Sequence, residues 1–150
     1  VRCASPLRSV CWIDGYLSTD GGRSFEFCST PVKYTGFNGN PPALVHMADG
    51  RLCLVYGYRS RPCGIRCVLS CDNGRTWKND TLLRTDAGNW DIGYPRAVQR
   101  TDGKIVALYY YNDAADSERY IAATIFNPDE EETIAAMFER GFKMPVEWMG

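Results

Sequence analysis

The side chains best suited to chemistry lie between residues 88 and 96, where aromatic, acidic and basic groups follow one another. Asp91 has three candidate roles: an acid or base, an acceptor for a substrate hydroxyl, or the cap of the turn that contains it, which we favour. Trp90 and Tyr94 offer flat faces that suit a sugar ring, although core packing is the commoner role of strand aromatics. Arg96 follows Tyr94 by two residues and therefore shares its strand face.

Arginine dominates the basic residues of the chain. Of the 17 basic residues, 13 are arginine and 4 are lysine, and 18 acidic residues bring the net charge to about −1. A planar guanidinium group can bind a carboxylate through two hydrogen bonds. A nucleic-acid-binding protein that uses a basic face carries a larger positive charge. The composition therefore favours a small acidic ligand over a nucleic acid.

Seven cysteines and a single histidine, His46, are poorly arranged for a metal site. No pair has the CxxC spacing, and the four-residue spacing of Cys63, Cys67 and Cys71 does not suit zinc. We expect mostly reduced cysteines that pack as small apolar residues, which favours a cytoplasmic location. No cofactor motif is present, so we expect neither cofactor nor metal. No apolar run is long enough to predict a membrane span, and the start has no signal-peptide core.

Two patterns recur along the chain at nearly the same interval. Residues 18–25 match residues 70–77 as Ser-x-Asp-x-Gly-Arg-[Ser/Thr]-aromatic, an offset of 52. Residues 42–58 match residues 95–111 at an offset of 53, with proline, Asp-Gly, a basic residue, aliphatic residues and tyrosine in register. Two independent patterns at one spacing indicate a structural repeat.

Each repeat is expected to be a unit of antiparallel strands. Asp-Gly pairs at 49–50 and 102–103 separate apolar runs, which is typical of hairpins. The runs 52–56 and 105–111 are almost wholly apolar, so we expect strands buried on both faces. Further strands are expected at 8–18, 65–70, 77–84 and 120–126. Four antiparallel strands in about 52 residues describe one blade of a β-propeller.

The Ser-x-Asp pattern has a structural explanation. Glycine at its fifth position supplies positive φ in a tight turn, and the aspartate accepts backbone N–H groups of that turn. The aromatic residue that follows can pack against the hairpin. We therefore assign these residues a structural and not a catalytic role: Ser18, Asp20, Gly22, Phe25, Ser70, Asp72, Gly74 and Trp77.

These residues resemble the Asp-box, or bacterial neuraminidase repeat, of the sialidase superfamily. The resemblance covers roughly residues 8–127 and implies an all-β fold, with four-stranded antiparallel sheets arranged as propeller blades. For a full-length parent it implies exo-hydrolysis of a terminal acidic sugar, sialic acid, through a tyrosyl-glycosyl intermediate. Asp-boxes also occur in non-enzymes, so the alternative is a non-catalytic module that binds glycan or protein.

The resemblance also implies roles for particular residues. Tyr94 stands where the family has its nucleophile, and a neutral phenol avoids repulsion from the substrate carboxylate. A phenol needs a carboxylate base nearby. The family takes a glutamate from the start of another inner strand, and this chain has proline at the matching residues 39–42. We therefore expect the glutamate to belong to a blade that is absent here, and no residue matches the family's acid/base aspartate. Asp91 is the remaining candidate for acid/base chemistry.

The family holds the substrate carboxylate with three arginines. Arg59, Arg66 and Arg96 lie where such arginines could lie, with Arg61 close by, and Trp90 is a further candidate for substrate contact. A solvated surface charge is the alternative for each arginine.

The repeat predicts a partial propeller over residues 1–127, of about three blades. We expect an incomplete blade at 1–38, a full blade at 39–86 and a three-stranded blade at 87–127. Propellers close with four to eight blades. The chain is therefore a piece of a longer propeller, a homo-oligomer that completes a ring, or an open array.

After residue 127 the pattern changes to that of a short helix and tail over 128–150. Asn127 is the expected N-cap, and Gly141 the expected stop. Ile134, Met137 and Phe138 form one apolar face. We expect this face to cover the edge of the last blade, where a fourth strand is missing.

Overall fold

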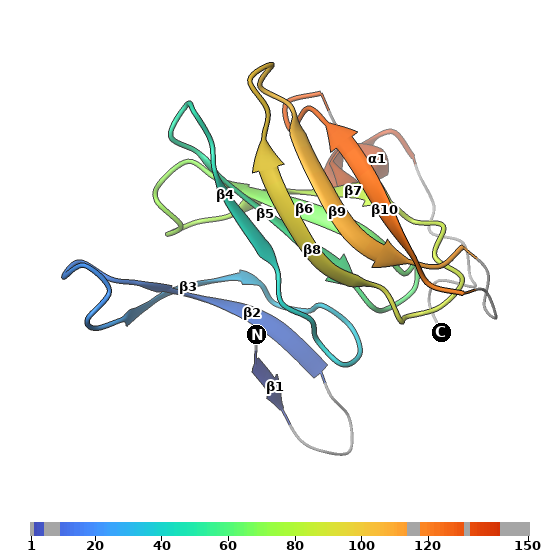
Figure 1. Ribbon diagram of the computed structural model, residues 1–150, viewed down its shortest axis with the longest axis horizontal. Helices are drawn as coiled ribbons and strands as arrows, with labels where there is room; N and C mark the ends of the chain where they lie inside the picture. The colour runs from blue at the N-terminus through green and yellow to red at the C-terminus, as the bar shows by residue number, and fades with distance from the viewer. Residues whose placement is uncertain (1, 5–9, 114–117, 131–132, 142–150) are drawn as a thin grey trace.

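The computed structural model describes residues 2–4, 10–113, 118–130 and 133–141. In these residues the chain is all-β with one short helix (Figure 1). The elements are β1 (Arg2–Ala4), β2 (Val10–Leu17), β3 (Glu26–Val32), β4 (Ala43–His46), β5 (Leu52–Tyr58), β6 (Gly64–Ser70), β7 (Lys78–Arg84), β8 (Gly93–Gln99), β9 (Ile105–Tyr111), β10 (Tyr120–Phe126) and α1 (Ile134–Glu139).

The strands form three antiparallel sheets, each from consecutive segments of the chain. The first sheet has the order β1-β2-β3, the second β4-β5-β6-β7 and the third β8-β9-β10. Both expected hairpins are confirmed, since Met47 N–H and Arg100 N–H donate across the Asp-Gly turns to Arg51 and Lys104 carbonyls, each at 2.8 Å. The later expected strands also form, with β9 and β10 at the predicted residues.

The second sheet is covered on both faces. One face, which includes Val55, packs against Ile105 and Ala107 of the third sheet. The other face carries Leu54 and Tyr56, whose cluster also includes residues of the first sheet. Strand β5 is therefore buried on both faces, as predicted.

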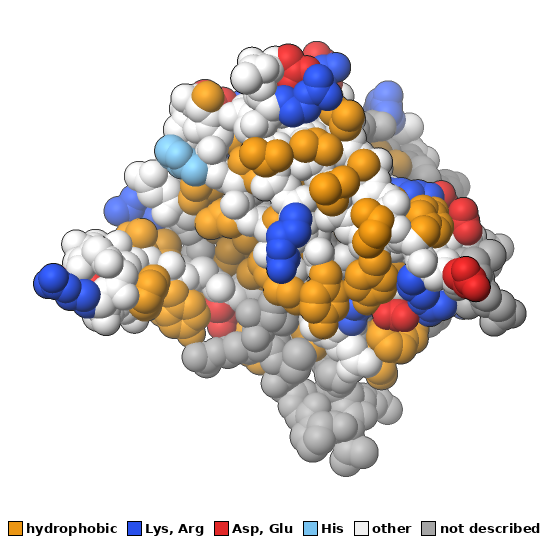
Figure 2. Space-filling model, in the orientation of Figure 1, with side chains coloured by type: hydrophobic (Ala, Val, Ile, Leu, Met, Phe, Trp, Pro, Cys, Tyr) orange, Lys and Arg blue, Asp and Glu red, His pale blue; other side chains and the backbone are white. Residues whose placement is uncertain are grey.

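Among the described residues the third sheet is covered on one face only, so the prediction that β9 is buried on both faces is wrong. Leu108 of β9 is 48% exposed, Val98 of β8 59%, and Ile121 and Ile125 of β10 75% and 52%. Figure 2 shows hydrophobic side chains gathered over these strands. The apolar pattern is that of a doubly covered strand, but within the described residues no sheet packs on this side.

The first Ser-x-Asp loop is closed by its own side chains. The Ser18 hydroxyl donates to Asp20 Oδ1 at 2.8 Å and accepts from Gly22 N–H at 2.8 Å. The Asp20 carboxylate also accepts from the amides of Arg23 and Ser24, each at 3.0 Å, and from the Ser24 hydroxyl at 2.6 Å. Gly22 has φ +86°, as expected for this turn. Hydrogen bonds from Ser24 hold the pKa of Asp20 well below its usual range.

The second loop repeats this arrangement. Ser70 donates to Asp72 at 2.8 Å and accepts from Gly74 N–H at 2.9 Å, and Gly74 has φ +82°. The amide and hydroxyl of Thr76 bond to Asp72 at 2.8 and 2.6 Å. These bonds lower the pKa of Asp72 to about 2.

The aromatic residues that follow the two loops differ. Trp77 is half-buried, and its indole N–H donates to the Gly74 carbonyl and to Ser29 Oγ of the first sheet, at 3.0 and 3.1 Å. Phe25 is 63% exposed, so the expectation that it packs against its hairpin is wrong. Trp77 reaches the preceding sheet, whereas no described sheet precedes that of Phe25.

The helix begins later than predicted. Its N-cap is Thr133, whose side chain accepts from Ala136 N–H, while Asn127 begins a separate turn that is closed by Glu130 N–H. The helix ends before Gly141, as predicted. The expectation that it covers the edge of the third sheet is wrong, because it packs against β7 of the second sheet. A bridge between Thr81 and Thr133 joins the two segments.

The cysteines are mostly reduced, as expected, among the residues that the structure describes. The cysteines that form no disulfide are Cys28, Cys53, Cys63, Cys67 and Cys71. Cys11 differs and is disulfide-bonded. Spacing along the sequence gave no indication of this bond.

Candidate functional site

A pocket of about 610 Å³ lies where the β5–β6 connection meets the loop that precedes β8. We call it the arginine pocket, because arginines are the charged residues among the described residues that line it. Its lining consists of Phe37, Arg59, Ser60, Arg61, Pro62, Cys63, Thr85, Ala87, Gly88, Asn89 and Trp90. A site of this size and polarity suits a small anionic ligand.

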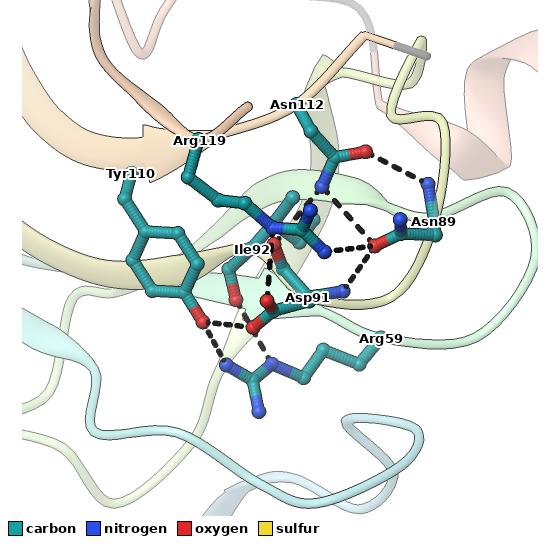
Figure 3. Close-up of polar contacts among 7 residues, drawn as sticks. All are labelled: Arg59, Asn89, Asp91, Ile92, Tyr110, Asn112 and Arg119. Atoms are coloured by element: carbon teal, nitrogen blue, oxygen red, sulfur yellow. Dashed lines mark hydrogen bonds and ion pairs between the residues drawn. The ribbon is translucent and has the colours of Figure 1, made fainter. Parts of the chain in front are cut away.

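Arg59 lines this pocket and is held in one orientation by hydrogen bonds, of which Figure 3 shows those to Ile92 and Tyr110. The side chain is buried, and its Nε donates to the Ile92 carbonyl at 2.9 Å. Its Nη1 donates to the Asn38 carbonyl at 2.5 Å and its Nη2 to the Tyr110 hydroxyl at 2.6 Å. A guanidinium group has five N–H donors, so two remain after these bonds.

A chain of charge-assisted bonds continues from Arg59 through Tyr110 and Asp91 to Arg119. The Tyr110 hydroxyl donates to Asp91 Oδ1 at 2.8 Å, and Arg119 Nε donates to Asp91 Oδ2 at 2.9 Å. Burial and the bond to Asp91 raise the pKa of Tyr110 to about 12. Tyr110 therefore stays protonated at neutral pH and serves as a bridge between a cation and a carboxylate.

The loop that carries Asp91 is fixed by two asparagines (Figure 3). Asp91 N–H donates to Asn89 Oδ1 at 2.9 Å. The buried Asn112 donates to the Asp91 carbonyl at 3.0 Å and accepts from Asn89 N–H at 3.0 Å. The prediction that Asp91 caps its own turn is wrong, because Asn89 makes the cap and the Asp91 carboxylate is directed to Tyr110 and Arg119.

Tyr94 is exposed beside this network. Its backbone has φ +50°, and its N–H donates to the buried Asn40 side chain at 3.2 Å. The ring is 51% exposed and lies 5.8 Å from the Tyr110 ring and 5.8 Å from the Arg59 guanidinium carbon. Among the described residues the Tyr94 hydroxyl has no hydrogen-bond partner. The group that the sequence singled out is thus accessible, without a base in contact.

Trp90 forms one wall of the arginine pocket. Its ring is 43% exposed and lies 6.1 Å from Phe37. The Arg59 guanidinium carbon lies 5.6 Å from the centre of the ring. The indole is therefore held beside a cation and still presents surface to a ligand.

The three arginines proposed as a clamp do not converge. Arg59 lines the arginine pocket. Arg66 lies on the opposite face of the second sheet, where its guanidinium carbon is 3.5 Å from the centre of the Tyr58 ring. Arg96 is exposed on β8, and its Nη1 donates to the Pro95 carbonyl at 3.0 Å. Arg61 is exposed at the pocket and has no polar partner in the described part of the chain.

Sequence reasoning missed Arg119, the two asparagines and the bridging role of Tyr110. Hairpin register could have indicated part of the network. Tyr120 pairs with Tyr111, which places Arg119 opposite Asn112 at the end of the hairpin, on the same face as Tyr110. No group of acidic, histidine or cysteine residues that could hold a metal occurs within the described ranges. None of the helices described there has the length and apolar character to cross a membrane.

No protein-family model matches this chain, and no curated protein matches it. The chain is similar to a crystal structure of a protein from Dyadobacter fermentans DSM 18053 that is described as being of unknown function. The two sequences are 35% identical and the TM-score is 0.58. The similarity covers 73% of this chain and 29% of the other, so this chain matches less than a third of that protein.

Proposed function

We propose that the arginine pocket binds a terminal acidic sugar, and that the chain is a segment of a sialidase-like β-propeller with its three sheets as blades. The observation that carries the proposal is the composition of the pocket. Two arginines and an exposed indole line it, and none of the described lining residues carries a carboxylate. An acidic sugar combines the two properties that such a lining recognises, a carboxylate and an apolar ring face.

The two arginines would have different tasks. Arg61 is exposed and free of described partners, so its guanidinium group can form a bidentate pair with the ligand carboxylate. Arg59 is fixed by three hydrogen bonds and adds positive charge without further ordering. The sugar ring would lie on Trp90, and Ser60 and Thr85 supply hydroxyl groups for its polar edges.

Hydrolysis is the further step in this proposal. The Tyr94 oxygen would attack the anomeric carbon while the bond to the leaving-group oxygen breaks, with the phenol proton passing to a carboxylate base and the leaving-group oxygen taking a proton from solvent. Water would then attack the anomeric carbon and release the sugar from Tyr94. Asp91 is the carboxylate three residues before Tyr94, but its two oxygens accept hydrogen bonds from Tyr110 and Arg119. Binding is therefore the function that the geometry supports best, and we expect hydrolysis by the chain alone to be weak.

Titration with N-acetylneuraminic acid, followed by NMR, tests the binding proposal. We expect Arg61→Gln to weaken binding about 10- to 100-fold, because it removes a hydrogen-bonded charge pair. Arg23→Gln is the matched control, since Arg23 is an exposed arginine in the first Ser-x-Asp loop. Binding that is as strong for galactose, or that is unchanged in Arg61→Gln, would contradict the proposal.

A fluorogenic sialoside tests the catalytic part. Turnover that disappears in Tyr94→Phe supports a tyrosine nucleophile. Turnover that persists in Tyr94→Phe removes Tyr94 from the mechanism. Sugar binding without turnover favours the non-catalytic module.

The exposed face of the third sheet supports a second proposal, self-association that extends the array of sheets. At the offset of 53 residues, Val98 and Leu108 correspond to Val45 and Val55. In the second sheet this pair is buried in the cluster shared with the third sheet, whereas in the third sheet its counterparts are exposed. We propose that the exposed face of the third sheet packs against a β-sheet of a second copy of the chain, as the equivalent face of the second sheet packs against the third sheet.

Light scattering over a range of protein concentrations tests the association. We expect a concentration-dependent dimer or larger ring, and a monomer for Leu108→Lys. Leu44→Lys is the control, because Leu44 is 59% exposed but lies on the second sheet. A wild-type chain that stays monomeric at all concentrations would rule out the association.

A further inference from the structure

A second cavity lies between the first and second sheets and shares no residue with the arginine pocket. Its volume is about 370 Å³, and its walls come from the end of β3, from β5 and β6, and from the start of β7. Tyr34 and Tyr58 form one wall, with ring centres 5.9 Å apart and planes at 77°. We call it the tyrosine cavity. Its volume is that of a small-molecule site.

The charges around the tyrosine cavity are strongly unbalanced. Lys33, Arg66 and Lys78 line it, against a single carboxylate, that of Asp80. Lys33 and Lys78 are exposed, and in the described part of the chain their ammonium groups have no acidic partner. The cavity therefore carries a formal excess of two positive charges at neutral pH.

Arg66 is buried in the wall of the cavity and is incompletely paired. Its guanidinium group stacks on Tyr58, and the residue is 9% exposed. Its Nε is buried without a hydrogen-bond acceptor among the described residues. The contact from Nη1 to Asp80 is 3.4 Å, longer than the 2.7–2.9 Å of a well-formed charge-assisted bond. Asp80 also accepts from Tyr56 at 2.8 Å, so its charge is shared.

We propose that the tyrosine cavity binds a small carboxylate that carries a ring. Stacking on Tyr58 fixes the plane of the Arg66 guanidinium group, which leaves its edge to meet a planar carboxylate. Asp80 can balance only one of the three positive charges, so Lys33 and Lys78 leave the cavity positive and attract the ligand carboxylate. The ring of the ligand lies against Tyr34, which is 44% exposed. The site does not depend on the acidic-sugar proposal, because the two pockets have separate linings.

Titration of the full chain with benzoate, followed by amide NMR shifts, tests this site. We expect saturable shifts at Lys33, Tyr58 and Asp80, and none at these residues with benzyl alcohol, which has the ring without the charge. Inorganic phosphate distinguishes a carboxylate site from a general anion site. Phosphate shifts equal to those of benzoate would overturn the carboxylate assignment, as would the absence of saturable shifts at millimolar benzoate.

Two exposed lysines allow a test that does not disturb folding. We expect Lys33→Gln and Lys78→Gln each to weaken benzoate binding about two- to five-fold. Arg66→Gln should weaken it about 10- to 100-fold, if the variant folds. Lys104→Gln, at the exposed β8–β9 turn, should leave the affinity unchanged. Equal effects of Lys104→Gln and Lys78→Gln would show that only net charge matters and would overturn the site.

Discussion

Replacement of Tyr110 by phenylalanine is the sharpest test of the network beside the arginine pocket. The variant keeps the ring and its packing, and it removes one hydroxyl group. That hydroxyl accepts from Arg59 at 2.6 Å and donates to Asp91 at 2.8 Å. Any loss of stability therefore reports on these two bonds.

The two partners of the hydroxyl should contribute unequally to the loss. Arg59 is 6% exposed, so its Nη2 loses an acceptor that water cannot easily replace. The Asp91 side chain is 39% exposed and keeps its bond from Arg119, so water can take the place of Tyr110 there. We expect the free energy of unfolding to fall by about 1.5–3 kcal/mol, the range for a hydrogen bond to a charged group. The unfolding midpoint should fall by about 2–4 °C per kcal/mol.

Alkaline pH provides a second measurement on the same variant. The pKa of Tyr110 is raised to about 12, against an ordinary value near 10. The unfolded chain therefore loses this proton first. The stability that Tyr110 contributes is complete below pH 10 and is lost as the pH rises from 10 to 12. The difference between wild type and Tyr110→Phe should narrow over this window.

Tyr120→Phe is a matched control, because Tyr120 also lies between an arginine and an aspartate. Its hydroxyl accepts from Arg84 at 3.0 Å and donates to Asp113 at 3.4 Å, but the residue is 38% exposed. Water can replace both bonds, so we expect a loss below about 1 kcal/mol. Equal losses in thermal unfolding for the two variants would refute the argument that burial of Arg59 makes the Tyr110 bond important.

Two further predictions concern the frame around the sites. Gly64→Ala should reduce the free energy of unfolding by about 3 kcal/mol or more, because the new Cβ would lie 1.8 Å from the Arg84 carbonyl oxygen. Gly50→Ala lies at an open turn with φ +86° and should reduce it by about 1–2 kcal/mol in the same thermal unfolding assay. Asp129→Asn removes the ion pair with Arg51, whose bonds are 2.6 and 2.8 Å; because Asp129 is 58% exposed, the loss should stay below about 1 kcal/mol. Arg51 lowers the pKa of Asp129, so the stability that the ion pair contributes is present above the unfolded pKa near 4 and should vanish as the pH falls through the folded pKa. A stability difference between wild type and Asp129→Asn that persists in acid would exclude the ion pair as its source.

The strands could be predicted because their causes are local. Asp-Gly turns and alternating or continuous apolar runs are properties of a few neighbouring residues, and β9 and β10 form where these patterns place them. Whether a face of a sheet is buried depends on the sheets that pack on it, so it could not be derived from the apolar runs of the sequence. Val55 and Leu108 occupy equivalent repeat positions, yet Val55 is buried and Leu108 is 48% exposed.

The candidate site could be predicted only in part. Trp90, Asp91 and Tyr94 are close in sequence and remain close in the fold. The error over Arg66 has a simple cause in strand alternation. Ile65 belongs to the core shared with the third sheet, and the next residue, Arg66, therefore faces the first sheet. Arg59 lies beyond the end of β5, where alternation no longer decides the direction of a side chain, and loop contacts direct it to the pocket.

The position of the arginine pocket follows from a close approach of the second and third sheets. A Cβ on Gly57 would lie 3.0 Å from the Gly93 Cα, and a Cβ on Gly93 would lie 2.4 Å from the Asn40 side chain. Asn40 joins the two strands at this point, since it donates to the Gly57 carbonyl at 3.3 Å and accepts from Tyr94 N–H at 3.2 Å. Arg59 is two residues beyond Gly57, and this approach lets it reach groups of the third sheet. A side chain at either glycine would separate the strands and withdraw Arg59 from the site, although neither glycine lines the pocket.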